Sequence, residues 1–379
     1  MKMRVLITGG AGFVGHHTAN KLADDGCEVR ILDNLSKQVH INPTESISRL
    51  HPAIEFINAD IRNHSKLQTA LKDIDIIYHF AAETGVGQSM YEIERYSDVN
   101  IQGTAVLCDC IAKMKGCVKK VILSSSRAVY GEGPYRCESC GIVNPEARTL
   151  TQLKAGSWEP ACPKCGYDIT AIPCQETALC RPTSIYGMTK KVQEDLLSIF
   201  TNTYNLPVVI LRYFNVFGAG QSVSNPYTGL LSIFSSLLLA NKDIEIYEDG
   251  LMQRDFIPVR DVVIANAKAL ELDLSGVLVL NVGSGVKRTI IELAKYLKAK
   301  ANSSSRIKFT SRYRVGDVRH CYADVSKACS YIEQSSKDSF EQQISDLIAW
   351  VKTHDRGLSM YDSIAELSHF GLSGIAKEF

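Results

Sequence analysis

The sequence has almost no net charge and no long hydrophobic run. Its 42 basic residues nearly balance its 41 acidic residues, which leaves a formal charge of +1 across 379 residues. A balanced chain lacks the field that would hold nucleic acid or an anionic membrane, so we expect neither as a partner. No segment approaches the roughly 18 consecutive apolar residues of a membrane-spanning helix. The opening MKMRVLITGG also lacks the apolar core of a signal peptide, so we expect a cytoplasmic location.

Internal repeats and low-complexity linkers are also lacking, and the first half of the chain alternates apolar runs with helical stretches. The apolar runs are short, rich in β-branched residues and hydrophobic throughout, which is typical of strands buried on both faces of a parallel sheet. The sequence therefore predicts an α/β protein with a Rossmann-type doubly wound sheet. We expect strands over residues 3–8, 28–33, 54–58, 75–80, 118–126 and 207–214, and helices over 13–25, 64–72, 91–114 and 186–203.

A glycine-rich turn follows the first expected strand and opens the first expected helix. In ITGGAGFVG, Gly9, Gly12 and Gly15 recur every third residue, which lets the backbone approach a pyrophosphate at a helix N-terminus. Asp33 ends the second strand, 18 residues after Gly15. A carboxylate there accepts hydrogen bonds from both ribose hydroxyls and repels a 2′-phosphate, so the pattern favours NAD over NADP. A packing turn would use the same glycines but would not require the aspartate.

Tyr186 and Lys190 lie four residues apart in SIYGMTKK and therefore share one face of an expected helix. The ordinary pKa of a tyrosine is about 10, and a nearby ammonium together with a cationic nicotinamide favours the phenolate. A tyrosine in that setting is a usable general base. Ser126 ends the fifth strand, at the edge of the sheet where this class of fold binds ligands, and can donate a hydrogen bond to a substrate oxygen.

Two Cys-x-x-Cys pairs, in YRCESCG and ACPKCGYD, follow the fifth strand, with 21 residues between them and a glycine after each. In a cytoplasmic protein this spacing is typical of a structural zinc ribbon. Free thiols and disulfides are the alternatives, and Cys174 and Cys180 lie near enough in sequence to replace a ligand. The expected ligands are Cys137, Cys140, Cys162 and Cys165.

Nine motifs occur in the order in which one enzyme family carries them: TGGAGFVG, ILDN, ADIRN, YHFAAE, VNIQGT, SSSRAVYG, YGMTK, RYFNVFG and RDFIPVRDV. From Arg4 to about Asp324 the chain resembles an extended short-chain dehydrogenase/reductase of the nucleotide-sugar epimerase/dehydratase group. The resemblance implies NAD as the cofactor, a dTDP- or UDP-linked sugar as the substrate and a homodimer as the assembly. It implies that Ser126, Tyr186 and Lys190 are catalytic.

The resemblance also implies which residues bind the two ligands. NAD would contact Gly9, Gly12, Phe13, Val14, Gly15, Asp33, Asn34, Asp60, Ile61, Phe80, Ala81, Ala82, Asn100, Ser124, Tyr186, Lys190 and Phe214. The substrate would contact Thr84, Ser126, Arg127, Asn215, Arg254 and Arg314. The last three of these would hold its diphosphate, and the planar fork of arginine suits phosphate oxygens.

These expectations divide the chain into two domains and a tail. Residues 1–214 form the NAD-binding domain, with a zinc-ribbon insertion at 132–180. Residues 215–366 form a smaller mixed domain for the nucleotide sugar, with a strand near 277–282 that returns to the first sheet. Residues 367–379 are a tail.

The residues after Ser126 favour one reaction within the group. Dehydratases carry an acidic residue there, where this chain has Arg127 and Ala128. The resemblance therefore implies 4-epimerisation through a 4-keto sugar, with NAD retained. The cysteine region and QSVSNPYTGLLSIF resemble dTDP-L-rhamnose 4-epimerases, which interconvert dTDP-L-rhamnose and dTDP-6-deoxy-L-talose. A UDP-hexose or UDP-N-acetylhexosamine 4-epimerase is the alternative.

The zinc ribbon lies in an unexpected place, because it joins two catalytic elements. Ser126 and Tyr186 are 60 residues apart, more than the family generally uses. The insertion has few large apolar residues, so a bound metal would supply the folding energy that its core lacks. We hypothesise that it forms a wall or lid over the sugar. Zinc ribbons also bind nucleic acid or proteins, so an NAD-sensing binding module is a remote alternative, although the charges of 136–168 cancel.

Overall fold

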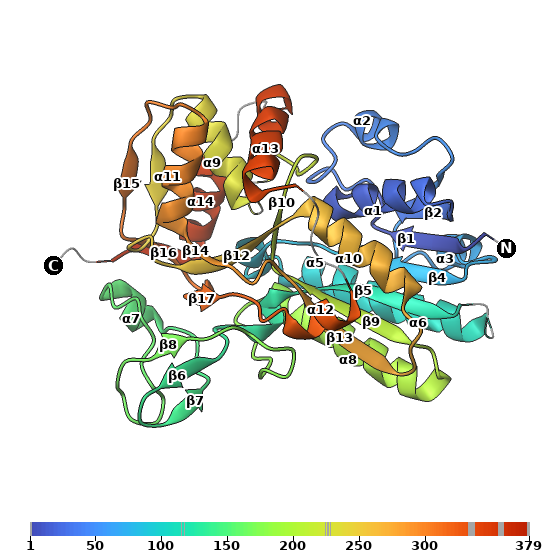
Figure 1. Ribbon diagram of the computed structural model, residues 1–379, viewed down its shortest axis with the longest axis horizontal. Coiled ribbons are helices and arrows are strands. Elements are labelled where there is room, and N and C mark those ends of the chain that lie inside the picture. The colour runs from blue at the N-terminus through green and yellow to red at the C-terminus, as the bar shows by residue number, and fades with distance from the viewer. Residues whose placement is uncertain are drawn as a thin grey trace.

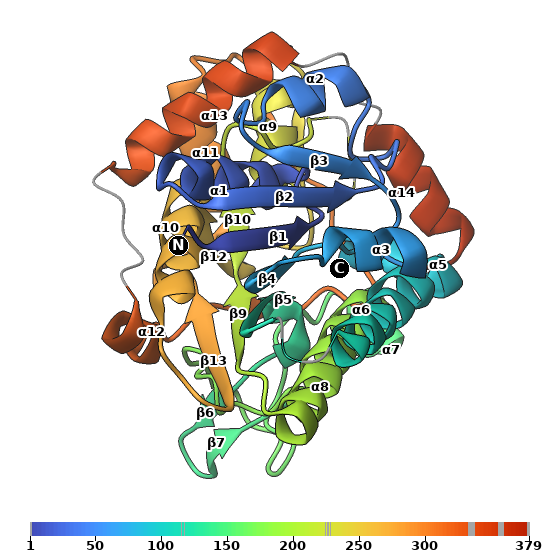
Figure 2. The same cartoon turned by 90° about the vertical axis from the view of Figure 1, so that its right-hand side faces the viewer.

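The computed structural model describes residues 2–114, 116, 118–223, 225, 227, 229–332, 338–354 and 360–376. Its centre is a seven-stranded sheet in the order β13-β9-β5-β4-β1-β2-β3, with all neighbouring strands parallel. Figure 2 shows β3, β2, β1 and β4 in this order from top to bottom. The predicted doubly wound sheet is confirmed. Its strands are β1 (Arg4–Thr8), β2 (Glu28–Asp33), β3 (Glu55–Asn58), β4 (Ile76–His79), β5 (Lys120–Ser126), β9 (Val208–Tyr213) and β13 (Val277–Val282).

Helices cover both faces of this sheet. On one face, α1 (Phe13–Asp24) and α10 (Val259–Glu271) share an apolar core with the strands, and α12 (Ser326–Tyr331) extends it. On the other face, α3 (His64–Ala70), α6 (Gly103–Lys113) and α8 (Ile185–Tyr204) form a second core. Successive residues of β1 alternate between them, because Val5 and Ile7 point to the first core and Leu6 to the second. Burial on both faces explains why the strand is apolar without alternation.

The helix expected over 91–114 is continuous from Ile93 to Lys113, but it contains a π-helical turn. Two short helices, α4 (Val86–Ser89) and α5 (Ile93–Ser97), lead into a π-helical turn, η1 (Asp98–Gln102), before α6 begins. The π turn carries Asn100, whose side chain bonds both the N–H and the C=O of Glu83 at 2.8 and 3.1 Å and the Thr189 hydroxyl at 2.9 Å. Such turns recur at functional sites, and here Asn100 ties the loop after β4 to α8.

The second half of the chain forms a smaller mixed domain. β10 (Asn215–Phe217), β12 (Gln253–Pro258), β14 (Lys287–Thr289) and β17 (His320–Cys321) share one sheet, and β11 (Ile244–Ile246) pairs with β15 (Ile307–Phe309). Helices α9 (Leu230–Leu239), α11 (Ile290–Lys300) and α13 (Phe340–His354) pack on an apolar core of their own. The predicted strand over 277–282 is β13, and it returns to the first sheet beside β9.

The expected tail from residue 367 needs correction. Helix α14 (Met360–His369) extends into it, and β18 (Ser373–Ile375) then pairs antiparallel with β16 (Arg312–Arg314). The strand is too short to show a periodic pattern in sequence, and its place depends on a partner about 60 residues away. Residues 377–379 lie outside the described residues, as do Ser224, Pro226 and Thr228 of the stretch QSVSNPYTGLLSIF.

The insertion at 132–180 is a small separate layer, visible at the lower left of Figure 1 next to β17. It contains a three-stranded sheet of β6 (Tyr135–Cys137), β7 (Gly141–Val143) and β8 (Thr170–Ala171), and a short helix, α7 (Leu150–Lys154). Its core centres on Tyr135, Cys137, Val143 and Cys162. None of the helices in the described part of the chain is long and apolar enough to cross a membrane.

Candidate active site

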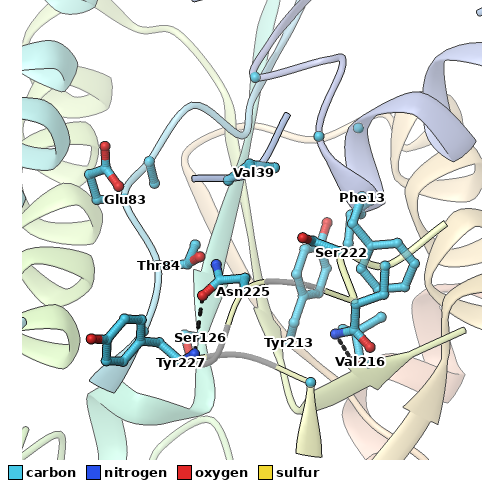
Figure 3. Close-up of a pocket in the computed structure, with 18 of the residues that line it drawn as sticks. Phe13, Val39, Glu83, Thr84, Ser126, Tyr213, Val216, Ser222, Asn225 and Tyr227 are labelled. Carbon is cyan, nitrogen blue, oxygen red and sulfur yellow. Dashed lines mark hydrogen bonds between the residues drawn. The ribbon is translucent and has the colours of Figure 1, made fainter. Parts of the chain in front are cut away.

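A cavity of about 620 Å³ opens at the carboxyl ends of the central strands and continues to the second domain (Figure 3). Three predicted residues lie behind its wall and bond to residues that line it: Asp60 to Asn34, Asn100 to Glu83, and Lys190 to Ser124. The other predicted residues line it directly: Gly9, Gly12, Phe13, Val14, Gly15, Asp33, Asn34, Ile61, Phe80, Ala81, Ala82, Thr84, Ser124, Ser126, Arg127, Tyr186, Phe214, Asn215, Arg254 and Arg314.

The glycine turn at the start of α1 has no room for side chains. A Cβ on Gly15 would lie 2.3 Å from the carbonyl oxygen of Gly9. Asp33 is 7% exposed and accepts hydrogen bonds from the N–H groups of Ala11 and Leu35 at 3.0 and 2.8 Å. The carboxylate therefore fixes both the turn and the loop after β2, at the edge of the cavity where a ribose would lie.

Asp60 is held ionised beside this end of the cavity. The Arg62 side chain, with its hydrogen bond to the carboxylate, is the main reason that the pKa of Asp60 is lowered to about 2, and Asn34 contributes a further bond. Asp60 Oδ1 also accepts the N–H of Arg62 at 2.9 Å. The pair locks the turn after β3 next to Ile61, a buried residue that lines the cavity.

Tyr186 lies in the first turn of α8, which begins where Ser184 caps the helix by accepting the N–H of Gly187 at 3.1 Å. A Cβ on Gly187 would lie 2.5 Å from the carbonyl oxygen of Ala128, so this glycine lets α8 approach η2 (Arg127–Tyr130). That close approach brings Tyr186 to Ser126. Burial raises the pKa of Tyr186, while the hydrogen bond with Ser126 and the charge of Arg127 lower it.

Burial is thus the largest influence on the pKa of Tyr186. We had expected the charge of Lys190 to lower this pKa, and Lys190 is not among the groups that shift it. The ammonium of Lys190 instead donates to the carbonyl oxygen of Ser124 at 2.8 Å. Burial also lowers the pKa of Lys190 to about 7, although Glu194, one helical turn further along α8, opposes it. Glu194 is itself engaged in a buried ion pair with Arg212, at 2.7 Å.

The lowered pKa of Lys190 predicts a pH-dependent stability difference. Between the folded pKa of about 7 and the usual 10.5, the unfolded chain binds more protons than the folded chain, so Lys190 makes stability rise with pH across this window. Below pH 7 the cost of burying the ammonium is complete. Replacing Lys190 with Met removes this cost, which wild type bears in full at pH 6 and only in part at pH 9. The Tm of the variant minus that of wild type should therefore fall by roughly 5 °C between about pH 6 and pH 9.

Melting curves at both pH values test this, and Lys191→Met is the matched control. Lys191 is the next residue of α8, partly exposed and paired with Asp195, so its Tm difference from wild type should not change with pH. Parallel pH curves for Lys190→Met and wild type would show that Lys190 stays charged when buried.

Cations gather at the other end of the cavity. Arg127 Nε donates to Asn215 Oδ1 at 3.0 Å. Arg314 forms an ion pair with Asp317 at 2.9 Å. Arg254 is 7% exposed, and burial, followed by the charge of Arg127, lowers its pKa to about 10. Cations held in a buried pocket favour a polyanionic ligand such as a diphosphate.

Sequence reasoning missed several lining residues. The loop after β2 contributes Val39 and His40, and the loop before α9 contributes Asn225 and Tyr227, some of which are labelled in Figure 3. Trp350 of α13 also reaches the cavity, and no motif pointed to it. Glu194 does not line the cavity, but a signal for its effect on Lys190 did exist, because it follows Lys190 by four residues on the same face of α8.

The four predicted cysteines do come together. Their sulfur atoms all lie within 4.8 Å of one another, and those of Cys137 and Cys165 are 3.5 Å apart. Four sulfurs at about 2.3 Å from a central zinc would be about 3.8 Å apart, so the cluster fits the ion. A glycine with positive φ ends each pair, Gly141 at 75° and Gly166 at 76°, as the predicted turns require.

Cys174 and Cys180, the other candidate ligands, lie elsewhere. The Cys174 sulfur faces that of Cys321 in β17 at 3.9 Å, and the Cys180 thiol contacts the carbonyl of Ala178. The cysteines of the described chain are free of disulfides. The hypothesis of a wall or lid over the sugar is not supported, since no described residue from 132 to 180 lines the cavity. The insertion instead packs outside it, against the strand segment that contains Cys321.

Comparison with known proteins identifies the family of this chain. The sequence profile of the NAD dependent epimerase/dehydratase family matches residues 5–151 and 155–283. The chain belongs to that family. The resemblance drawn from its nine motifs is thereby confirmed, together with the extended short-chain dehydrogenase/reductase fold.

Relatives of this family member include several 4-epimerases. The dTDP-L-rhamnose 4-epimerase of Burkholderia thailandensis is 36% identical over 92% of this chain and 94% of its own. A UDP-N-acetylglucosamine 4-epimerase from Methanobrevibacter ruminantium was solved with UDP-N-acetylmuramic acid. It is 32% identical, with a TM-score of 0.76, and the match covers 93% of this chain and 99% of that one. The UDP-glucose 4-epimerase of Thermus thermophilus, solved with NAD, is 26% identical with a TM-score of 0.72, covering 92% and 99%.

Proposed function

We propose that this protein is an NAD-dependent nucleotide-sugar 4-epimerase that interconverts dTDP-L-rhamnose and dTDP-6-deoxy-L-talose. The observation that carries the proposal is the position of Tyr186 beside Ser126, in a cavity that the glycine turn and Arg254 both line. A cofactor and a nucleotide sugar would meet at that tyrosine. The 36% identity with a dTDP-L-rhamnose 4-epimerase over nearly the whole chain supports the choice of sugar.

The side chains at the centre of the cavity suit a reversible oxidation at C4 of the sugar. Tyr186 takes the proton of the C4 hydroxyl as the C4 hydrogen departs as hydride, which leaves a 4-keto sugar. Ser126 donates a hydrogen bond to the C4 oxygen. NAD, held by the glycine turn and Asp33, would supply a reversible hydride acceptor at this position, so the reaction would involve no net redox change. The 4-keto sugar then rotates in the cavity so that the opposite face of C4 is presented, and Tyr186 gives its proton back to the C4 oxygen.

Cofactor and substrate would occupy opposite ends of the cavity. The glycine turn, Asp33 and the loop after β4 would hold NAD, and Asn215, Arg254 and Arg314 would hold the diphosphate. Arg127 lies at the position where a dehydratase needs an acid, and it bonds Asn215, so dehydration is disfavoured. UDP-hexose or UDP-N-acetylhexosamine 4-epimerisation is the second candidate, because the solved relatives are named as 4-epimerases of UDP-linked sugars.

We further propose one structural zinc ion in the cluster of Cys137, Cys140, Cys162 and Cys165. Four thiolates close the coordination sphere, which leaves no position for a reacting water. The homodimer and the cytoplasmic location expected from the sequence stay predictions.

Proton NMR of dTDP-L-rhamnose incubated with the purified protein in D₂O, without added cofactor or reductant, tests the proposal. Inversion at C4 with no deuterium at any sugar carbon is expected, since the hydride never exchanges with solvent. Deuterium at C3 or C5 would contradict the mechanism, because it requires proton abstraction beside a keto group. Unchanged dTDP-L-rhamnose, with conversion of UDP-glucose or UDP-N-acetylglucosamine, would move the substrate to the second candidate.

A further inference from the structure

The segment from Asp317 to Asp324 lies between the insertion and the strand that carries Arg254. On one side, β17 pairs with β12, so that Cys321 lies opposite Arg254. On the other side, Cys174 of the insertion forms a bridge with Ala323, and the Tyr322 hydroxyl donates to the carbonyl of Ala171 at 3.1 Å. The insertion therefore contacts the substrate end of the cavity through this segment.

Arg254 is held by the backbone of the same segment. Its guanidinium donates to the carbonyl oxygens of Arg319 at 2.9 Å and Val318 at 2.5 Å, and also to that of Gln253. These bonds use several of its five donors and fix the plane of the group. Any shift of residues 318 and 319 would therefore move the guanidinium of Arg254, a residue that lines the cavity.

Arg319 anchors this backbone, and the insertion supplies two of its four carboxylate partners. The Arg319 side chain is 0% exposed and pairs with Glu159 at 2.7 Å, Glu248 at 3.0 Å and Asp249 at 2.7 Å. Its N–H donates to Glu132 Oε2 at 2.7 Å. Glu132 and Glu159 belong to the insertion. A fully buried guanidinium is stable only when carboxylates neutralise it, so these contacts are required to keep Arg319 in place.

A second buried arginine links the insertion to Arg314. Arg148, also in the insertion, pairs with Glu248 at 2.8 Å and donates to the carbonyl oxygen of Asp317 at 2.9 Å. The carboxylate of Asp317 is the partner of Arg314. Arg254 and Arg314, which are predicted to hold the diphosphate, therefore each contact residues 317–319 directly, and the insertion fixes this segment.

Glu159 connects these ion pairs to the cysteine cluster. It lies three residues before Cys162, and the buried Pro160 between them has a fixed φ that stiffens the link. Its second oxygen lies 3.0 Å from Nε2 of His320, so one carboxylate holds two consecutive residues of the segment. A shift of the second Cys-x-x-Cys pair would therefore also shift Arg319 and His320.

We propose that the insertion positions the diphosphate-binding arginines from outside the cavity, and that Glu159 is its principal positioning residue. The proposal rests on the function proposed above for Arg254 and Arg314. Glu159 does not line the cavity, so its loss would act on the affinity for the nucleoside diphosphate and not on the chemistry at Tyr186. Substrate binding then depends on a folded zinc ribbon that never enters the cavity.

Glu159→Gln tests the proposal, because it keeps the shape of the side chain and removes its charge. Calorimetric titration with dTDP and with UDP should show about tenfold weaker binding than in wild type. KM for the nucleotide sugar should rise by a similar factor while kcat changes less than about twofold. The content of bound NAD should stay that of wild type. Glu146→Gln is the matched control, since Glu146 lies in the same insertion and pairs with the exposed Arg181.

The outcomes separate the two proposals. Weaker diphosphate binding in Glu159→Gln alone, with NAD retained, supports the positioning role. Wild-type binding by Glu159→Gln overturns it, and so does an equal loss in Glu146→Gln or a loss of NAD, either of which indicates general destabilisation. If wild type itself binds neither dTDP nor UDP, the proposed substrate class fails, and the positioning proposal fails with it.

Discussion

Replacing Tyr186 with Phe should lower kcat by about 10³-fold while bound NAD stays at its wild-type level. The substitution removes only the hydroxyl beside Ser126, so the ring still fills its place in the first turn of α8. Because burial raises the pKa of Tyr186, the base loses its proton only as pH rises. Wild-type kcat should therefore increase between about pH 6 and pH 9, and the residual activity of the variant should lose this dependence.

The matched control is Tyr204→Phe, at the exposed end of the same helix, where the side chain is 55% exposed. Its kcat should equal that of wild type. NAD is measured by absorbance after denaturation of the purified protein, which separates loss of the base from loss of the cofactor. A Tyr186→Phe variant that keeps a tenth or more of the wild-type kcat would mean that another group takes the C4 proton.

Replacing Cys162 with Ser should release zinc and unfold the insertion while leaving the central sheet folded. Structural zinc contributes roughly 10 kcal/mol or more to small sites, and the insertion core of Tyr135, Cys137, Val143 and Cys162 is too small to replace it. Trypsin should then cleave after Lys154 or Lys164 about 100-fold faster than in wild type, because local unfolding controls cleavage. Zinc per chain and the cleavage rate are measured together.

Cys329→Ser is the control, since Cys329 is exposed and far from the cluster in sequence. It should keep both its zinc and its resistance to trypsin. NAD content should be unchanged in both variants, because no described residue of the insertion lines the cavity. Full zinc in Cys162→Ser would remove that cysteine from the ligand set, and a metal-free wild type that resists trypsin would show that the insertion folds without an ion.

Much of the central sheet could be predicted because its strands and turns have local signals. Each strand is an apolar run bounded by turn residues, and the glycine spacing and Asp33 together identify the first βαβ unit. The π-helical turn within the helix over 91–114 had no such signal. It depends on Asn100 bonding to Glu83 and to Thr189 of a different helix, which is a tertiary contact. Strand β18 was missed for the same reason.

In the candidate site, too, the features with a local sequence signal were predicted and those that depend on tertiary contacts were not. Residues within motifs, such as Ser126 and Tyr186, were placed correctly in one cavity, since the strand ends meet there. The raised pKa of Tyr186 was not predictable, because burial depends on the packing of α8 against η2 and not on the spacing to Lys190. The ion pairs of Arg319 join four distant parts of the chain. Their charges looked like an ordinary balanced surface in sequence.

Strand β13 has a consequence for synthesis on the ribosome. It pairs with β9 over six residues of each strand, and all six residues of β9 are buried. Until residue 282 has left the exit tunnel, β9 is an unpaired apolar edge, which is the kind of surface that chaperones bind and that aggregates when exposed. The nucleotide-binding half therefore cannot complete its folding when its own first 214 residues have been made, and it waits for most of the second domain.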